Sequence, residues 1–335
     1  MWILRIDMKE LSYKLEDVPE RYRLLYGRAL TSQMIFEEVP PLCHALGPNN
    51  KLVFSAGIVT STSAPTSARV SVGCKSPLTG GIKEANAGTS WAPDLASMRI
   101  RALVIEGFPE QGEKYWGTFI SWDKDAGKPK VEFFDATGYT GQDVYDTFPK
   151  IYERFEGRIS ICGVGNAGEK SYGNSGIVFN DQAKRPSRYA GRGGVGAVLA
   201  SKRLKFIILN EKGSPGVDIV DKALFDEGRK KMIDAIRSHA ISKPKGGLNS
   251  YGTNVLVNIL NEAGGLPTRN FTSGQFAAHD KISGETMHDT IVARGGNPTH
   301  GCHRGCQIQC SQVYNDKDGK YVTSGFEYET IWGLG

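Results

Sequence analysis

Short apolar runs alternate with glycine-rich turns along the chain up to about residue 200. Runs of this length, bounded by glycine, proline or asparagine, are typical of β-strands. A further apolar run at 205–209 is expected to form the last strand of this region. The pattern therefore predicts sheets, with strands at 52–59, 68–72, 102–106, 118–122, 131–134, 158–162 and 176–179.

One helix is predicted among these strands, between residues 141 and 155. Val144, Phe148 and Ile151 recur at intervals of three and four, which places them on one face of a helix. A second, short helix is expected to begin at Gly194.

The pattern changes after residues 212–216, which read Lys-Gly-Ser-Pro-Gly. Apolar periodicity then predicts helices at 218–242 and 251–263. The stretch 264–300 is poor in periodic apolar residues and rich in glycine, threonine and asparagine, so it is expected to be irregular.

These elements predict the α+β fold class, in two domains. Residues 1–212 form a β-rich domain, and residues 213–335 are the beginning of a mainly helical domain. Because the last ten residues are apolar almost to the end, the chain is expected to be truncated within an element.

Composition is that of a globular protein, and it excludes some partners. Of 335 residues, 39% are hydrophobic and 23% charged, and no run approaches the ~18 apolar residues of a membrane helix. The net charge of +5 is mild, and no basic blocks interleave with aromatic residues, so nucleic acid is not an expected partner. The first residues lack a secretory pattern, and a cytoplasmic location is expected.

Three cysteines give the strongest indication of chemistry. Cys302, Cys306 and Cys310 form a Cys-x3-Cys-x3-Cys run. Three thiolates on one short stretch suit a cubane iron–sulfur cluster, in which each iron takes one thiolate. Tetrahedral zinc and three reduced thiols are the alternatives.

A cubane would need a fourth ligand. It would be Cys43, Cys74 or Cys162, or it would lie outside this chain. His300 and His303 are close enough in sequence to donate hydrogen bonds to sulfur or to bind the metal, although most such histidines lie in the second shell or on the surface.

Other segments have the composition of anion-binding loops. Small hydroxyl residues at 61–68 lead to Arg69, and Arg188 and Arg192 lead with several glycines into the helix expected at Gly194. The Ala-Asn-Ala-Gly segment at 85–88 has an ordinary turn as its alternative. A Gly-x-Gly-x-x-Gly pattern at 163–168 is not followed by a periodic helix, so no dinucleotide site is expected there.

Two glutamates near the end of the chain could act on protons. Glu327 and Glu329 would share a face in a strand but not in a helix. Their apolar neighbours would desolvate a carboxylate and suit it to proton transfer, whereas the alternative is a solvated side chain.

Taken in order, these segments resemble the N-terminal half of the aldehyde ferredoxin oxidoreductase family. Its members are tungsten- or molybdenum-pterin enzymes that oxidise aldehydes to carboxylic acids. The resemblance covers nearly the whole chain and rests on residues 51–57, 62–66 with Arg69, 75–80, 85–88, 191–198, 251–259, the cysteine run and 327–334.

The resemblance implies a cofactor site. In that family an N-terminal domain of two β-sheets holds the metal through two pterins, whose phosphates are bridged by magnesium. It implies that Cys302, Cys306 and Cys310 bind a [4Fe–4S] cluster and that Glu329 is a general acid or base beside the metal. The residues that it places against the pterins are Arg69, Asn86, Gly88, Arg188, Tyr189, Gly191 and Arg192.

Two features depart from the family pattern. The first cysteine gap is one residue longer than the common Cys-x2-Cys-x3-Cys spacing. The helical domains that normally supply the fourth cluster cysteine and the substrate channel lie beyond residue 335, so a missing C-terminal part or a second chain is expected to complete the site.

The expected function is oxidation of an aldehyde, with electrons passing through the cluster to ferredoxin or to an iron–sulfur partner subunit. Three alternatives stay open. They are a family member that reduces an aromatic thioester, a non-catalytic pterin and iron–sulfur electron-transfer subunit, and a zinc-bound structural protein.

Overall fold

The computed structural model describes residues 1–109 and 114–334. Contacts between Cα atoms divide the chain into two compact units, Met1–Asp218 (unit 1) and Ile219–Gly335 (unit 2). Among the described residues, no helix is both long and apolar enough to cross a lipid bilayer.

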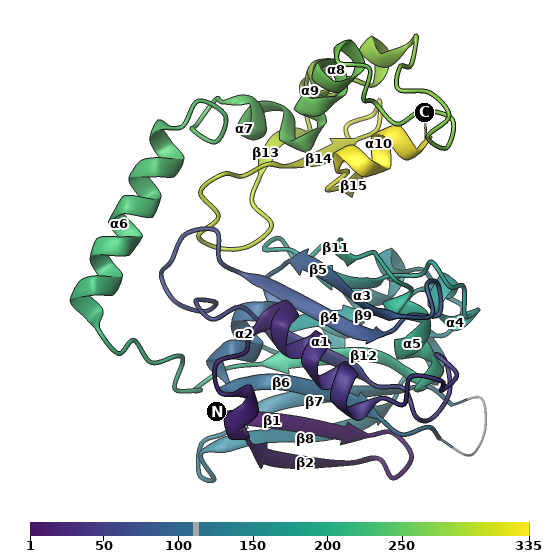
Figure 1. Ribbon diagram of the computed structural model, residues 1–335, viewed down its shortest axis with the longest axis vertical. Coiled ribbons are helices and arrows are strands. Elements are labelled where there is room, and N and C mark those ends of the chain that lie inside the picture. Colours follow the sequence, from purple (N-terminus) through teal and green to yellow (C-terminus); the bar gives the residue numbers. More distant parts are fainter. Residues whose placement is uncertain (110–113, 335) are drawn as a thin grey trace. The chain divides into compact units, whose positions relative to one another are not determined.

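Unit 1 is built on two six-stranded sheets (Figure 1). In the first sheet β1 and β6 are parallel and all other neighbours antiparallel. In the second sheet only β7 and β12 are parallel. The first sheet has the order β2 (Ser12–Asp17), β1 (Trp2–Asp7), β6 (Ile100–Glu106), β3 (Leu52–Ala56), β4 (Arg69–Lys75), β5 (Ile82–Gly88), and the second β11 (Pro186–Ala190), β10 (Ile177–Asn180), β9 (Ser160–Gly163), β12 (Leu204–Asn210), β7 (Trp116–Asp123), β8 (Lys128–Asp135).

Helices lie on the outer faces and between the sheets. α1 (Gly27–Glu38) packs against β3, β4 and β5 on the outer face of the first sheet, and the apolar side of α3 (Val144–Arg154) covers the second. α2 (Trp91–Ser97) and α5 (Val195–Ser201) contact strands of both sheets. The remaining helical turns are η1 (Glu20–Tyr22), η2 (Thr137–Tyr139) and α4 (Asn166–Glu169).

Strand alternation distributes the apolar residues over three clusters. On β3, Phe54 faces the layer between the sheets, where it meets Trp91 of α2 at a ring-centroid distance of 5.5 Å. Its neighbour along the strand, Val53, faces the opposite way and packs beneath α1 with Leu30 and Met34. This double burial explains why all five residues of β3 are buried and why four of them are apolar.

Unit 2 combines helices with a small antiparallel sheet. The sheet has the order β13 (Asn297–His300), β14 (Ser311–Asn315), β15 (Tyr321–Ser324). Its helical elements are α6 (Lys222–Ser238), α7 (Gly247–Tyr251), η3 (Gly252–Val255), α8 (Leu256–Glu262), η4 (His279–Ile282), α9 (Gly284–Ala293) and α10 (Tyr328–Leu334).

The α+β class is confirmed, while several individual elements differ from expectation. More helices than the one at 141–155 interrupt the strands of unit 1, since α1 and α2 do so as well. The strands β1, β2, β5 and β11 of unit 1 were not expected, and neither was the sheet of β13, β14 and β15 in unit 2. The stretch 264–300 is not irregular throughout, because α9 forms there behind an N-cap at Ser283, whose Oγ accepts a hydrogen bond from Thr286 N at 3.2 Å.

Candidate cofactor-binding sites

The first candidate site begins at one end of the β4–β5 hairpin. Antiparallel register places Arg69 opposite Gly88 and Ser71 opposite Asn86. Arg69 Nε donates a hydrogen bond to Asn86 Oδ1, and Asn86 Nδ2 donates one to Ser71 Oγ at 3.0 Å. The Arg69 side chain is exposed, so its guanidinium is held at the sheet edge without being buried.

Strand β11 carries the second part of this site. Arg188 and Tyr189 lie on consecutive positions, so their side chains alternate: Arg188 is buried, whereas Tyr189 is 48% exposed. Gly191 and Arg192 follow the strand and are exposed. Arg69 and Arg192 are therefore the solvent-facing guanidinium groups of the set, while Arg188 belongs to the interior.

Packing brings the two parts together, although a hundred residues of chain separate them. The edge strands β5 and β11 are in contact. The loop after β11 is anchored there too, because Ser76 Oγ donates to Gly193 O at 2.7 Å and a Cβ at Gly193 would lie 2.4 Å from Lys83 Cγ. Gly193 has φ +73°, which an L side chain rarely adopts. Any larger residue would displace this loop from β5.

This arrangement can hold an anionic organic group. Guanidinium groups bind phosphate oxygens with two parallel hydrogen bonds, and a glycine lets the backbone approach closely. Arg69, Arg192 and the amide of Asn86 supply the charge and donors, and Gly88 and Gly191 leave space beside them. The residues present therefore fit the phosphates of a pterin.

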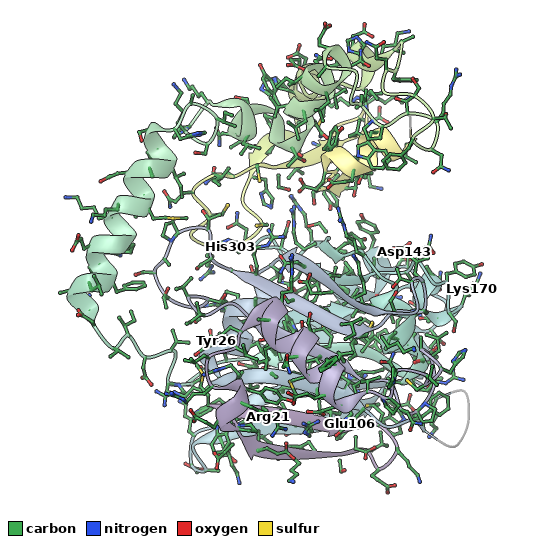
Figure 2. All side chains as sticks on the ribbon, viewed as in Figure 1. Arg21, Tyr26, Glu106, Asp143, Lys170 and His303 are labelled. Carbon is green, nitrogen blue, oxygen red and sulfur yellow. The ribbon has the colours of Figure 1, made fainter. Side chains whose placement is uncertain are left out.

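Unit 2 contains a cluster of possible metal ligands on the loop between β13 and β14. One of them, His303, is labelled in Figure 2. One ligand atom each from Cys302, His303 and Cys306 lie within 4.8 Å of one another. His303 is 3% exposed and Cys306 7%, so these two side chains are largely shielded from water, whereas Cys302 is partly exposed. Two thiols and an imidazole are donors that iron and zinc both accept.

The pKa of the Cys306 thiol lies well below its ordinary value. A hydrogen bond from Cys302 is the main cause that lowers the pKa of Cys306 to about 5, and burial opposes it. The backbone N–H of Gln309 also donates to Cys306 Sγ at 3.4 Å and stabilises the thiolate. A thiolate is the form that binds metal.

Cys310, the third cysteine of the run, is not a member of this close group. It lies where the loop enters β14, and its backbone pairs with His300 in a parallel bridge. Its carbonyl accepts a hydrogen bond from Gln312 Nε2 at 2.8 Å. The donor set of the loop thus fits an iron or zinc centre through Cys302, His303 and Cys306, with Cys310 set apart from them.

Of the three other cysteines, two are core residues. Cys74 on β4 and Cys162 on β9 are 0% exposed, and burial raises the pKa of both, to about 12 for Cys74. Such thiols stay protonated and pack as small apolar groups. Cys43 is partly exposed, so it is the one cysteine of unit 1 that solvent reaches.

The two glutamates take different environments at the start of α10. Glu327 Oε2 accepts a hydrogen bond from Thr253 Oγ1 at 2.7 Å, and the same hydroxyl accepts one from Tyr328 N at 2.9 Å. Glu329 lies in the first turn of α10 and is exposed. The apolar residues of this chain therefore do not desolvate Glu329. The anchoring role of Thr253 was not expected from the sequence.

Comparison with known proteins places the chain in a family. The model of the aldehyde ferredoxin oxidoreductase N-terminal domain matches residues 3–211, and that of domains 2 and 3 of the same family matches residues 227–335. A tungsten-containing aldehyde ferredoxin oxidoreductase from Thermococcus kodakarensis is 37% identical over 335 residues, and that from Pyrococcus furiosus 35%. Both alignments cover 99% of this chain and 51% of the relative, so the chain spans about half the length of these relatives.

A solved structure supports the fold over both units. The active site complex BamBC of benzoyl coenzyme A reductase, in complex with 1,5-dienoyl-CoA, aligns with a TM-score of 0.75. The alignment covers 97% of this chain and 48% of that chain, at 20% identity. The family models and relatives together show that this chain belongs to the aldehyde ferredoxin oxidoreductase family, a family of oxidoreductases.

Proposed function

We propose that the chain is the pterin- and cluster-binding half of a tungsten- or molybdenum-pterin oxidoreductase that oxidises an aldehyde to a carboxylic acid. The observation that carries this proposal is the 37% identity, over 335 residues, with a tungsten-containing aldehyde ferredoxin oxidoreductase. The substrate is an aldehyde by analogy with that relative.

Unit 1 holds the cofactor in this proposal. Arg69 and Arg192 would bind pterin phosphates through their guanidinium groups, and a magnesium ion would share in neutralising the charge of those phosphates. Asn86 and the backbone beside Gly88 and Gly191 would supply hydrogen bonds to the pterins. The exposed ring of Tyr189 would contact a pterin, and the buried Arg188 would contribute positive charge from beneath the strand.

Unit 2 serves electron and proton transfer. Cys302, Cys306 and Cys310 hold a [4Fe–4S] cluster, which supplies one-electron transfer when bound. Glu329 accepts or returns a proton at its carboxylate, and its exposure in this chain leaves it accessible to substrate. Thr253 positions the start of α10 by its hydrogen bonds to Glu327 and Tyr328.

The proposed enzyme needs two further components besides this chain. Because the chain spans 51% of its relatives, the substrate channel and further pterin contacts come from a C-terminal part or a second chain. Electrons leave to ferredoxin or to an iron–sulfur subunit, and the compartment is the cytoplasm.

The second candidate is reduction of an aromatic thioester. It is favoured by the likeness of fold to BamBC of benzoyl coenzyme A reductase. The 37% identity to the aldehyde enzyme exceeds the 20% identity to BamBC, so aldehyde oxidation is the first candidate. A non-catalytic electron-transfer subunit would bind both cofactors and turn over neither substrate.

Assays on anaerobically purified protein, with any co-purifying partner, separate these candidates. We expect tungsten or molybdenum, pterin, iron and sulfide, together with aldehyde-dependent reduction of a viologen dye. Turnover of benzoyl-CoA without turnover of aldehydes supports the second candidate. Cofactors with neither activity indicate the electron-transfer subunit, and zinc without iron or pterin overturns the proposal.

The pterin site has its own test in Arg69→Ala. Loss of a charged hydrogen-bonding partner costs about 1.5–3 kcal/mol, so pterin retention should fall roughly ten-fold or more. Arg23→Ala is the matched control, since Arg23 is an exposed arginine of unit 1 whose Nε pairs with Glu20 at 2.8 Å. Equal pterin content in both variants removes Arg69 from the site.

Glu329 is tested by Glu329→Gln in the complete enzyme. Replacing the carboxylate by an amide removes the proton acceptor and keeps the size of the side chain, so turnover should fall about 100-fold or more. Unchanged turnover with intact cofactor content removes Glu329 from the proposed mechanism.

A further inference from the structure

We infer that Ser71 is a positioning residue of the pterin site, which holds the Asn86 amide and, through it, the Arg69 guanidinium. The inference rests on the proposed function only in taking Arg69 as a partner of a pterin phosphate. Ser71 itself does not contact the anion and acts through the two side chains in between.

Ser71 lies on the face of β4 that α1 covers (Figure 1). Successive side chains of a strand alternate, so Val70 and Val72 pack between the two sheets while Ser71 faces α1. A Cβ built on Gly27, the first residue of α1, would lie 3.6 Å from Ser71 Oγ. Because Ser71 is 4% exposed, its hydroxyl is out of reach of a ligand that approaches from solvent.

The Ser71 hydroxyl has one hydrogen-bonding partner. Burying a hydroxyl costs free energy unless a hydrogen bond compensates for the lost water. Within residues 1–109 and 114–334, the hydrogen bond of the Ser71 side chain is the one from Asn86 Nδ2, at 3.0 Å. An apolar side chain would satisfy the packing beneath α1, so the contact with Asn86 is the reason for a serine at this position.

Asn86 transmits this constraint to Arg69. It lies opposite Ser71 in the β4–β5 ladder, and its Oδ1 accepts a hydrogen bond from Arg69 Nε. The two polar atoms of a planar amide point in different directions, so fixing Nδ2 on Ser71 fixes Oδ1 toward Arg69. Without the serine hydroxyl the amide could turn over and present its NH2 group to Nε, which would place two donors against each other.

This contact sets how Arg69 can bind an anion. Since Nε is already engaged, the terminal nitrogens Nη1 and Nη2 are left as the pair of parallel donors that a phosphate accepts. The Arg69 side chain is exposed, and a long exposed side chain loses conformational entropy when a ligand immobilises it. A guanidinium that Asn86 already holds has less of this entropy to lose, so Ser71 increases the affinity of the site.

Ser55 is the matched control. It lies opposite Ser71 in the β3–β4 ladder and is 0% exposed. Its hydroxyl donates a hydrogen bond to Arg101 O at 2.9 Å and accepts one from Gly27 N at 3.1 Å, so it anchors β6 and the start of α1. Ser55→Ala therefore measures the loss of a buried hydroxyl on this face that does not bond to Asn86.

The test is the rate at which pterin leaves the full chain, purified anaerobically with any co-purifying partner and then diluted. Pterin that stays bound is measured by its fluorescence after oxidation. We expect about five-fold faster loss in Ser71→Ala, equivalent to one net hydrogen bond, and no change in Ser55→Ala. When Arg69 is already alanine, Ser71→Ala should have no further effect, because a residue that acts through Arg69 then has no side chain to position. Urea unfolding checks that each variant is folded.

The outcomes separate this inference from the proposed function. Pterin loss from Ser71→Ala at the rate of the unaltered chain overturns the inference and leaves the proposed function standing. An equal effect of Ser71→Ala with and without Arg69 shows a general structural role and overturns it as well. Protein that contains no pterin overturns the proposed function, and the inference with it.

Discussion

Units 1 and 2 differ most in how much apolar surface they bury. Unit 1 has three clusters of buried apolar residues, one between the sheets and one beneath each outer helix. In the described part of unit 2, the buried apolar side chains are few. They are Ile236, Val257, Leu266, Ile291, Cys306 and Val313.

Helix α6 shows the difference clearly. It is 17 residues long, yet Ile236 is its one buried residue. Leu224 and Met232 are 66% and 51% exposed. Since tertiary packing of an apolar face supplies most helix stability in proteins, α6 receives little of it from this chain.

Much of unit 2 is held together by hydrogen bonds between polar groups rather than by an apolar core. Asn249 Nδ2 donates to Ile308 O at 3.0 Å, and Thr299 Oγ1 donates to Asn249 O at the same distance. These bonds fix the base of the cysteine loop. Because a hydrogen bond contributes only about 1 kcal/mol net, we expect the residues of unit 2 by themselves to be less stable than those of unit 1.

Separating the units should give the largest effect. We expect residues 1–218 alone to unfold cooperatively in urea, because both sheets and all three clusters lie within them. Residues 219–335 alone, without metal, should show no cooperative transition. Urea unfolding followed by circular dichroism measures both. A cooperative transition in the metal-free second fragment would contradict the comparison.

Replacing a tryptophan by alanine should lower the free energy of unfolding by different amounts in the two units. Trp91 is 0% exposed between the sheets, so Trp91→Ala should lower the free energy of unfolding of unit 1 by about 3–5 kcal/mol. Trp332 on α10 is only partly buried and contacts Phe271 edge-on, so Trp332→Ala should cost about 1 kcal/mol or less. Urea midpoints of the full chain measure both, and equal costs would refute the contrast.

A buried lysine makes the stability of unit 1 depend on pH. Lys202 is 0% exposed, and burial is the main cause that lowers its pKa from 10.5 to about 8. Between these values the unfolded chain binds the proton and the folded chain does not. The free energy of unfolding should therefore rise as pH increases from 8 to 10.5, by up to about 3 kcal/mol.

Lys202→Met removes this rise, because methionine does not titrate. The difference between the two unfolding curves at pH 8, 9 and 10 isolates Lys202, since every other titrating group is present in both proteins. Parallel pH profiles would show that Lys202 keeps its proton on folding.

The smallest effect is expected on α6. Leu224→Ser should change the stability of the isolated full chain by no more than about 0.5 kcal/mol, because its side chain already faces solvent. Ile236→Ser, on the buried side, should cost about 2 kcal/mol or more. Thermal unfolding measures both. A large cost at Leu224 would mean that α6 is covered within this chain.

Local patterns predicted most strands, and long-range packing decided the rest. The runs that became β3, β6 and β12 are mostly apolar, and this local pattern was enough to predict them. Helix α1 was missed because its buried face includes Thr31 while Phe36 is exposed, which blurs the apolar stripe. Ala85 to Gly88 was read as a possible turn because small residues are depleted in strands, yet pairing with β4 makes it the end of β5.

The candidate sites were predictable to different degrees. Cysteine spacing is local, so Cys302 and Cys306 could be expected to meet. The separation of Cys310 depends on how the loop enters β14, and the approach of His303 depends on the fold of that loop. The convergence of β5 with β11 involves residues a hundred positions apart, and residue type alone marked these segments only as anion-binding candidates.

The outer edges of the two sheets have a consequence for the chain while it folds. Edge strand β2 carries Lys14 and Glu16, and edge strand β8 carries Lys130, Glu132 and a proline at position 129. A foreign strand that docked there would meet a row of charges and, on β8, a residue with no amide hydrogen. These outer edges therefore disfavour the association of newly made copies of unit 1 through their sheet edges, which could otherwise lead to aggregation at high concentration.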